Sequence, residues 1–337
     1  MIEDAVLRAC NTPAPEVQTA PRQRQRPFRS EATQEPHAST RVPLRQIPRN
    51  FWYSSWSFRN THRLVRVLPR SVVRALSSAI GHLAFDLCDE RRDTMRDNLH
   101  VLTGLAGPEL MACTRATFVN FIQMIPDTIR FAASAMEEAK PLLTGSDGLD
   151  LLNASRARGR GTVLITGHLG AWELGGVLLA MLGVPITVVT YTEPQPELHR
   201  WRQEYRERFG IRTITLGDDK FAFVEIIKTL RQNGVVAILV DRPQDGGVPV
   251  QLAGRTSHFS PAPALLWKHT GATILPTCVL AEPDGKYRCH LYPPIEMRET
   301  PDPAEFQQVN AQRIADFFEK LIRQHPEQFY NFVPLWV

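Results

Sequence analysis

The sequence predicts an α/β fold, in which a mostly parallel central sheet is flanked by helices and follows an N-terminal helical region. The first observation behind this is composition: 43% of the 337 residues are hydrophobic and 22% are charged, which excludes collagen-like and wholly disordered chains. The second is a helical pattern over residues of about 51–140. The third is the alternation of short β-branched runs with helical patterns from about residue 150 onward, which is typical of βαβ units.

The first segment, residues 1–48, differs from the rest of the chain. Prolines recur among polar residues and arginines, at Pro13, Pro15, Pro21, Pro27, Pro36, Pro43 and Pro48. Few large apolar side chains are present to offset the entropy lost on ordering such a segment. We expect a disordered Pro/Arg-rich tail here, followed by a single domain over residues 49–337.

The helical pattern from residue 51 to 87 has three parts. Aromatic residues come first: Phe51, Trp52, Tyr53, Trp56 and Phe58. Arginines follow at helix-like intervals: Arg59, Arg63, Arg66, Arg70 and Arg74. Apolar residues then recur along one helix face: Val72, Leu76, Ile80, Leu83 and Leu87. Two interpretations stay open, namely a segment lying on an anionic membrane surface and an ordinary amphipathic helix with a solvated arginine face.

Several boundaries can be placed along the chain. Pro69 is expected to begin the main N-terminal helix, because a missing N–H costs nothing in the first turn. Two further apolar-periodic stretches are expected within residues 109–139. The apolar run 174–192 is interrupted by Gly183 and Pro185, so it predicts a helix, a turn and a buried strand rather than a membrane span. No apolar signal-peptide region follows Met1.

The expected sheet follows from the β-branched runs. Strands are expected at residues 162–166, 186–190, 211–215, 235–240, 273–280 and 287–292. Helices are expected to end near residues 182, 209 and 232, and to span residues 262–270 and 304–324. Gly210, Gly234 and Gly271 stand where helix C-caps are expected.

Charge and cysteine content exclude several classes of protein. The formal net charge of +4 is too small to indicate a nucleic-acid partner. The cysteines, Cys10, Cys88, Cys113, Cys278 and Cys289, form no Cys-x-x-Cys pair. Neither a zinc site nor a disulfide framework is therefore indicated, and we expect a reduced, cytoplasmic protein that needs no metal.

Two polar clusters follow predicted strands, where ligands bind in open α/β sheets. His168 comes after the first strand and Asp241 after the fourth. Gly167 and Gly170 permit a turn that would bring His168 over Glu173, whose carboxylate would orient the imidazole as a general base. No serine or cysteine nucleophile is evident, so the nucleophile would be a hydroxyl or amine of the substrate. The alternative is a strand-end histidine that caps a helix, with Glu173 as a solvated first-turn acid.

The run Thr166-Gly167-His168-Leu169-Gly170-Ala171-Trp172-Glu173 resembles the His-x4-(Asp/Glu) motif of the glycerolipid acyltransferase-like superfamily. It is most similar to the bacterial lipid A biosynthesis (late) acyltransferase family. Other matches follow in order within residues 60–337: Arg91-Arg92 with Asn98-Leu99, Arg206-x-Arg208-x-Gly210, Asp241, residues 247–250 with Gly254, residues 271–276, and residues 326–330. Asn331-Phe332-Val333-Pro334 stands where lipid A enzymes tend to have His-Arg-Arg, which resembles relatives that acylate other glycolipids, such as phosphatidylinositol mannosides.

The resemblance implies a glycerol-3-phosphate acyltransferase-like fold and an O-acyltransferase activity. A fatty acyl group would pass from a thioester on acyl carrier protein or coenzyme A to a hydroxyl of a lipid or glycolipid. The thioester would be a co-substrate, and no cofactor is implied. The enzyme would act as a peripheral protein on the cytoplasmic side of the inner membrane. A catalytically inactive lipid-binding relative and an N-acyltransferase acting on an amine remain alternatives.

The same resemblance assigns roles to particular residues. His168 would be the general base and Glu173 would hold its imidazole. The amides of Gly170 and Ala171 are candidates for stabilising the oxyanion. Candidates for binding substrate are Arg206, Arg208, Asp241 and Arg255, with Asp241 either positioning an arginine or lining the crevice.

Overall fold

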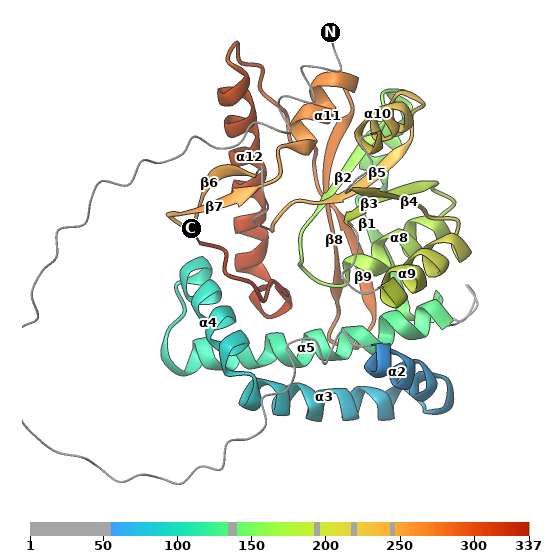
Figure 1. Ribbon diagram of the computed structural model, residues 1–337, viewed down its shortest axis with the longest axis vertical. Helices are drawn as coiled ribbons and strands as arrows, with labels where there is room; N and C mark the ends of the chain where they lie inside the picture. The colour runs from blue at the N-terminus through green and yellow to red at the C-terminus, as the bar shows by residue number, and fades with distance from the viewer. Residues whose placement is uncertain (1–54, 134–139, 192–195, 217–220, 243–246, 337) are drawn as a thin grey trace, which may run out of the picture. The chain divides into compact units, whose positions relative to one another are not determined.

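The computed structural model describes residues 55–133, 140–191, 196–216, 221–242 and 247–336 (Figure 1). All of these belong to the unit of residues 50–337. The predicted tail therefore lies outside the described residues, as do Phe51, Trp52 and Tyr53. The side chains of Trp56, Phe58 and Arg59 also lie outside the described part.

The central sheet is mostly parallel, as the sequence predicts. Its strand order is β1-β9-β8-β2-β5-β3-β4. The strands are β1 (Leu143–Asp147), β2 (Thr162–Thr166), β3 (Ile186–Tyr191), β4 (Arg212–Leu216), β5 (Val235–Leu239), β8 (Thr273–Ala281) and β9 (Tyr287–Leu291). Strands β8, β2, β5, β3 and β4 pair in parallel, whereas β9 is antiparallel to β8 and parallel to β1. The α/β class is thus confirmed.

Helices cover the sheet and precede it. In the α/β part they are α7 (Leu149–Ala157), α8 (Trp172–Met181), α9 (Pro196–Arg208), α10 (Ala222–Arg231), α11 (Ala262–Thr270) and α12 (Pro303–Gln324). The N-terminal helices are α2 (Ser55–Val67), α3 (Arg70–Leu87), α4 (Asp89–Thr103) and α5 (Gly107–Ala133). Figure 1 shows α3 and α5 running side by side, with α5 between α3 and the ends of β8 and β9.

The core lies on both faces of the sheet. Every residue of β2 is buried, and its side chains alternate between two apolar clusters, since successive strand residues point to opposite faces. Val163 and Ile165 pack into one cluster, and Leu164 packs into the other with Leu174 of α8. Burial on both faces is the usual condition of a parallel sheet.

Several elements were missed or misplaced by the sequence patterns. The antiparallel hairpin of β6 (Val248–Leu252) and β7 (Arg255–Phe259) was not predicted, nor were β1 and α7. Helix α4 lies within the predicted helical region of about residues 51–140, although no bounds were assigned to it. The two stretches expected within residues 109–139 form one helix, α5, as far as Ala133, with Pro126 inside it. Gly271 ends α11 in the left-handed region, as predicted. Gly234 was predicted to cap the C-terminus of the helix that is α10. This prediction was wrong, because Asn233 takes the left-handed position after that helix, with φ of 61°.

Helix α3 begins after Pro69, as predicted, but its apolar stripe is not its buried face. Val72, Leu76, Ile80, Leu83 and Leu87 are 39–56% exposed. The buried face includes small residues, Ser77, Gly81 and Ala84. A Cβ atom on Gly81 would lie 2.7 Å from the Val119 Cα of α5, so the two helices approach closely along this face. We name the five exposed residues the α3 apolar stripe.

The arginines of α3 also differ from their predicted placement. Arg70 donates to Asp127 Oδ1 from Nε at 2.9 Å and to Oδ2 from Nη2 at 2.7 Å. Arg74 Nη1 donates to Asp127 Oδ2 at 3.0 Å, and the Tyr287 hydroxyl donates to the same oxygen at 2.9 Å. Because Asp127 is buried, it draws both arginines inward, and only Arg63 and Arg66 of the described arginine series are exposed.

The part of the chain that the structure describes contains no helix with both the length and the apolar character needed to cross a membrane. The apolar run that begins at Leu174 divides into α8 and β3, with Gly183 in the turn between them.

Candidate active site

His168 and Asp241 meet at the carboxyl edge of the sheet. Strands β2 and β5 are paired in parallel, so the residues that follow Thr166 and Leu239 leave the sheet at the same edge. His168 Nδ1 lies 2.7 Å from Asp241 Oδ1, and the backbone N–H of His168 donates to Asp241 Oδ2 at 2.7 Å. A Cβ atom on Gly167 would lie 3.0 Å from Asp241 Oδ2, so glycine allows this close approach.

The pair is removed from water. Asp241 is 3% exposed and His168 is 8% exposed. Burial alone would raise the pKa of Asp241, but the charge of His168, two hydrogen bonds from it and the nearby Arg242 together lower that pKa. Asp241 is therefore a carboxylate that can hold the imidazole by its Nδ1.

Trp172 limits how the imidazole can move. Its ring lies edge-on to His168, with 4.9 Å between centroids and 63° between planes. Nδ1 is engaged by Asp241, so Nε2 is the ring nitrogen left to meet a substrate. In a neutral imidazole with Nδ1 protonated, Nε2 is an acceptor.

Glu173 does not orient His168, and this prediction was wrong. Both Glu173 oxygens accept hydrogen bonds from Arg206 Nη2, at 2.9 and 3.1 Å, and Arg202 Nη1 lies 3.9 Å away. Burial alone would raise the Glu173 pKa, but Arg206 and Arg202 lower it below its ordinary value. The first turn of α8 points the carboxylate towards α9 rather than towards the imidazole, so Glu173 ties these two helices together.

The predicted oxyanion donors are also occupied. The Gly170 amide donates to the Gln328 carbonyl at 2.8 Å, and the Ala171 amide donates to the Val279 carbonyl at 2.7 Å. Neither can turn towards a substrate without breaking a backbone hydrogen bond. The prediction for Gly170 and Ala171 was therefore wrong, since the chain pairs with β8 and the C-terminal segment before α8 begins.

The four predicted substrate-binding residues do not form one group. Asp241 holds His168, and buried Arg206 holds Glu173. Arg208, at the end of α9, and Arg255, at the start of β7, are exposed. No group of three or more His, Cys, Asp and Glu side chains within the described ranges is placed to hold a metal ion.

A C-terminal segment, residues 328–333, holds the two site loops together, and the sequence did not predict this role. Tyr330 donates its N–H to the His168 carbonyl at 2.7 Å. Asn331 Nδ2 donates to the Asp241 carbonyl at 3.1 Å. Asn98 of α4 donates from Nδ2 to the carbonyls of Asn331 and Val333, at 3.1 and 2.8 Å. Asn331, which stands between aromatic and apolar residues in the sequence, was the available signal, because a buried amide needs partners.

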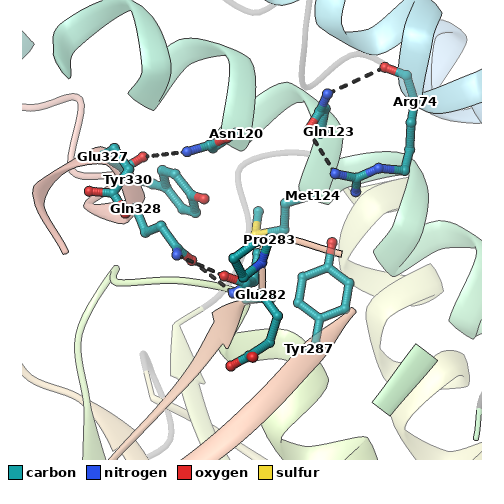
Figure 2. Close-up of a pocket in the computed structure, with 12 residues that line it drawn as sticks. Arg74, Asn120, Gln123, Met124, Glu282, Pro283, Tyr287, Glu327, Gln328 and Tyr330 are labelled. Carbon is teal, nitrogen blue, oxygen red and sulfur yellow. Dashed lines mark hydrogen bonds between the residues drawn. The ribbon is translucent and has the colours of Figure 1, made fainter. Parts of the chain in front are cut away.

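A pocket of about 300 Å³ adjoins these loops, between α5, the end of β8 and the C-terminal segment (Figure 2). Its lining is mixed polar and aromatic: Arg74, Asn120, Gln123, Met124, Ala171, Ala281, Glu282, Pro283, Tyr287, Glu327, Gln328 and Tyr330. Ala171 precedes α8, and Tyr330 is bonded to the His168 backbone. The pocket therefore lies beside the histidine loop.

Comparisons with known proteins identify the family of the chain. Residues 42–337 match the family described as bacterial lipid A biosynthesis acyltransferase. A phosphatidylinositol mannoside acyltransferase of Mycobacterium tuberculosis is 28% identical over 291 residues, which cover 84% of this chain and 89% of the relative. A protein of the same name from Mycolicibacterium smegmatis is 25% identical over 303 residues, which cover 89% of this chain and 95% of that relative.

Proposed function

Because the chain belongs to the bacterial lipid A biosynthesis acyltransferase family and is an O-acyltransferase, we propose that His168 is its general base, oriented by Asp241. The acyl group comes from a thioester and passes to a hydroxyl of a lipid or glycolipid. The observation that carries this proposal is the buried contact of 2.7 Å between His168 Nδ1 and Asp241 Oδ1.

In the proposed reaction, His168 Nε2 accepts the proton of the acceptor hydroxyl as its oxygen attacks the thioester carbonyl carbon. The new C–O bond gives a tetrahedral oxyanion. The C–S bond then breaks, the carbonyl re-forms, and the imidazolium returns its proton to the leaving thiolate. Asp241 stabilises the imidazolium by its negative charge and fixes the ring through Nδ1.

Stabilisation of the oxyanion is assigned to the first turn of α8. The first amides of a helix have no partner within it, and the helix dipole favours negative charge there. Trp172 and Glu173 supply these amides. The Glu173 contact with Arg206 supports the proposal, because it fixes that turn against α9.

The donor and acceptor classes rest on the comparisons. Acyl carrier protein or coenzyme A would carry the thioester, as the family resemblance implies. A glycolipid acceptor is supported by relatives named phosphatidylinositol mannoside acyltransferases. The proposal needs a single acceptor hydroxyl that can reach Nε2, and both lipid A precursors and mannosides carry such groups.

Peripheral attachment to the cytoplasmic face of the inner membrane is proposed from the α3 apolar stripe. A row of half-exposed aliphatic side chains along one helix is the surface that an interfacial helix buries among lipids. The exposed Arg63 and Arg66 of α2 would meet anionic headgroups. The sequence pattern suggested membrane contact through the arginine series. Because Arg70 and Arg74 of α3 bind Asp127, the proposal assigns the membrane contact of α3 to its aliphatic residues instead.

The test is acyl transfer by purified protein to a phosphatidylinositol mannoside, with acyl-coenzyme A and acyl carrier protein as separate donors. His168→Ala should lower turnover about 10²–10⁴-fold in a protein that remains folded by circular dichroism, with a lower melting temperature because buried Asp241 loses a partner. His269→Ala in α11 is the matched control and should retain activity. Near-normal turnover by His168→Ala would contradict the proposed base, and no transfer by the unaltered protein from either donor would contradict the proposed donor and acceptor pair.

A further inference from the structure

Helix α4 buries one polar side chain among apolar ones. Its buried face consists of Met95, Asn98, Leu99 and Leu102, and Asn98 is 1% exposed. An amide in such a place is costly unless its hydrogen-bonding groups find partners. The partners of its Nδ2 group are two carbonyls of the C-terminal segment, 233 and 235 residues away in the chain. Asn98 is therefore buried where it joins α4 to that segment.

This contact fixes the backbone around Phe332. Asn98 Nδ2 donates to the carbonyls of the residues on either side of it, at 3.1 and 2.8 Å. The Phe332 ring packs against Phe118 and Phe121 of α5, with centroid distances of 5.0 and 5.1 Å. Residues 331–333 are thus held by α4 through their backbone and by α5 through one ring.

The segment held in this way bonds both loops of the proposed site. The register of β2 with β5 extends to Thr166, and the two loops begin where this ladder ends. Tyr330 donates its N–H to the His168 carbonyl at 2.7 Å, and Asn331 Nδ2 donates to the Asp241 carbonyl at 3.1 Å. Because adjacent residues of one segment bond the two loops, a shift of the segment changes the spacing of the imidazole and the carboxylate.

We propose that Asn98 is a positioning residue for acyl transfer, which sets the spacing of His168 and Asp241 through the C-terminal segment. The inference rests on the proposed function, because it needs His168 as the base and Asp241 as its partner. The contact that depends on Asn98 is the distance of 2.7 Å between His168 Nδ1 and Asp241 Oδ1. A misplacement of about 1 Å can lower a rate about 10²-fold, so an amide that never meets substrate can affect turnover.

The first experiment compares Asn98→Leu with Asn310→Leu. Asn310 of α12 is the matched control, because it is 0% exposed and its Nδ2 also donates to two carbonyls, at 2.9 and 2.8 Å. Those carbonyls belong to Arg298 and Phe306 and not to the site loops. Both variants should lower the melting temperature, since each leaves two carbonyls without their donor. Only Asn98→Leu should lower kcat, about tenfold, with the acceptor KM nearly constant.

The second experiment is a double-mutant cycle between Asn98→Leu and Asp241→Asn. Because Asn98 acts through the contact of His168 with Asp241, its replacement should lower kcat less than about twofold once Asp241 is already Asn. In the unaltered protein the same replacement should cost about tenfold. A purely structural role for Asn98 would give the same fold loss of kcat in both backgrounds.

The third experiment does not depend on turnover. Diethyl pyrocarbonate modifies His168, and peptide mass spectrometry follows the rate. Asn98→Leu should raise this rate, because the imidazole, which is 8% exposed, is held less firmly. Asn310→Leu should leave it unchanged. If Asn98→Leu does not fold, Asn98→Ala takes its place in all three experiments with the same expected directions, because it leaves room for a water on the two carbonyls.

Three outcomes would overturn the inference and leave the proposed function intact: unchanged kcat in a folded Asn98 variant, equal losses of kcat in the Asn98 and Asn310 variants, or equal losses in both backgrounds of the cycle. Near-normal turnover by His168→Ala would instead contradict the proposed function, and the inference would fall with it. If the purified protein transfers no acyl group, the modification rates decide, and equal rates for His168 in the Asn98 and Asn310 variants would overturn the inference.

Discussion

Strand β2 and helix α3 both carry clear apolar patterns, yet the protein buries one and exposes the other. Every residue of β2 is buried, because both faces of the sheet are covered. The α3 apolar stripe is 39–56% exposed, because α3 packs on α5 through Ser77, Gly81 and Ala84. An apolar pattern thus predicts that a strand or helix forms. Which face of a helix is buried depends on where it can approach its neighbour most closely, as α3 approaches α5 at Gly81.

The difference separates two kinds of apolar residue. In β2, apolar side chains stabilise the fold. In α3, the stripe stays 39–56% exposed, and the proposed membrane contact would bury it. The following changes test that separation, from the largest expected effect to the smallest.

Replacing Leu76, Ile80 and Leu83 together with Gln should weaken binding to anionic vesicles on the order of 10³-fold, since each buried aliphatic side chain contributes about 1.5 kcal/mol. The free energy of unfolding should change little, because these side chains are already half-exposed. Vesicle sedimentation and urea unfolding measure the two quantities. Leu182→Gln with Val224→Gln, at exposed sites outside the stripe, is the control. Unchanged vesicle binding in the triple variant would show that the stripe does not contact lipid.

Replacing Asp241 with Asn should lower kcat on the order of 10²-fold, because the amide cannot stabilise the imidazolium by charge. The acceptor KM should stay nearly constant, since Asp241 acts through His168. Steady-state kinetics at saturating donor separate the two parameters. Loss of kcat together with global unfolding would indicate a structural role for Asp241 instead.

Replacing Gly81 with Val should lower the free energy of unfolding by about 1–3 kcal/mol, the usual cost of overpacking. The new Cβ would lie 2.7 Å from Val119 Cα, so α3 must move away from α5. Ala79→Val, on the exposed side of the same helix, controls for helix propensity and should cost less than about 0.7 kcal/mol. Equal losses in the two variants would disprove the close approach.

The smallest expected effect is on the pH dependence of stability: replacing Glu173 with Gln should flatten the loss of stability in acid. The folded protein lowers the Glu173 pKa, so the unfolded chain binds this proton more readily. The carboxylate therefore stabilises the fold above its unfolded pKa of about 4.3, and this contribution is lost as the pH falls through the lower folded pKa. Urea unfolding between pH 3 and pH 7 measures the slope, and identical slopes in both proteins would contradict the assignment.

The sequence predicted the α/β order because its signals are local. Residues 162–166 and 262–270 match β2 and α11, since β-branched runs and a terminal glycine act within one element. The exposed face of α3 was not predictable, because it depends on how α3 packs against α5 in the folded protein. The β6–β7 hairpin and β1 were missed, since their burial alternates or is partial and leaves no continuous apolar run.

At the site, sequence analysis selected His168 and Asp241 but gave the imidazole the wrong partner. Glu173 was favoured because it lies near in sequence, whereas Asp241 is 73 residues away. Only the parallel pairing of β2 with β5 brings that aspartate to His168. Arg206 was selected as a substrate-binding residue from its resemblance to a family motif, and its burial against Glu173 could not be foreseen from the sequence.

The hydrogen bonds of the C-terminal segment have a consequence for the order of folding. Asn98 meets the Asn331 carbonyl across 233 residues, and Asn331 meets Asp241 across 90. Contacts between distant residues form slowly, because long loops must close first. During refolding from urea, helical circular dichroism should therefore recover before catalytic competence. Acyl transfer should therefore begin only after residues 328–333, which are synthesised late, have bonded to the loops of His168 and Asp241.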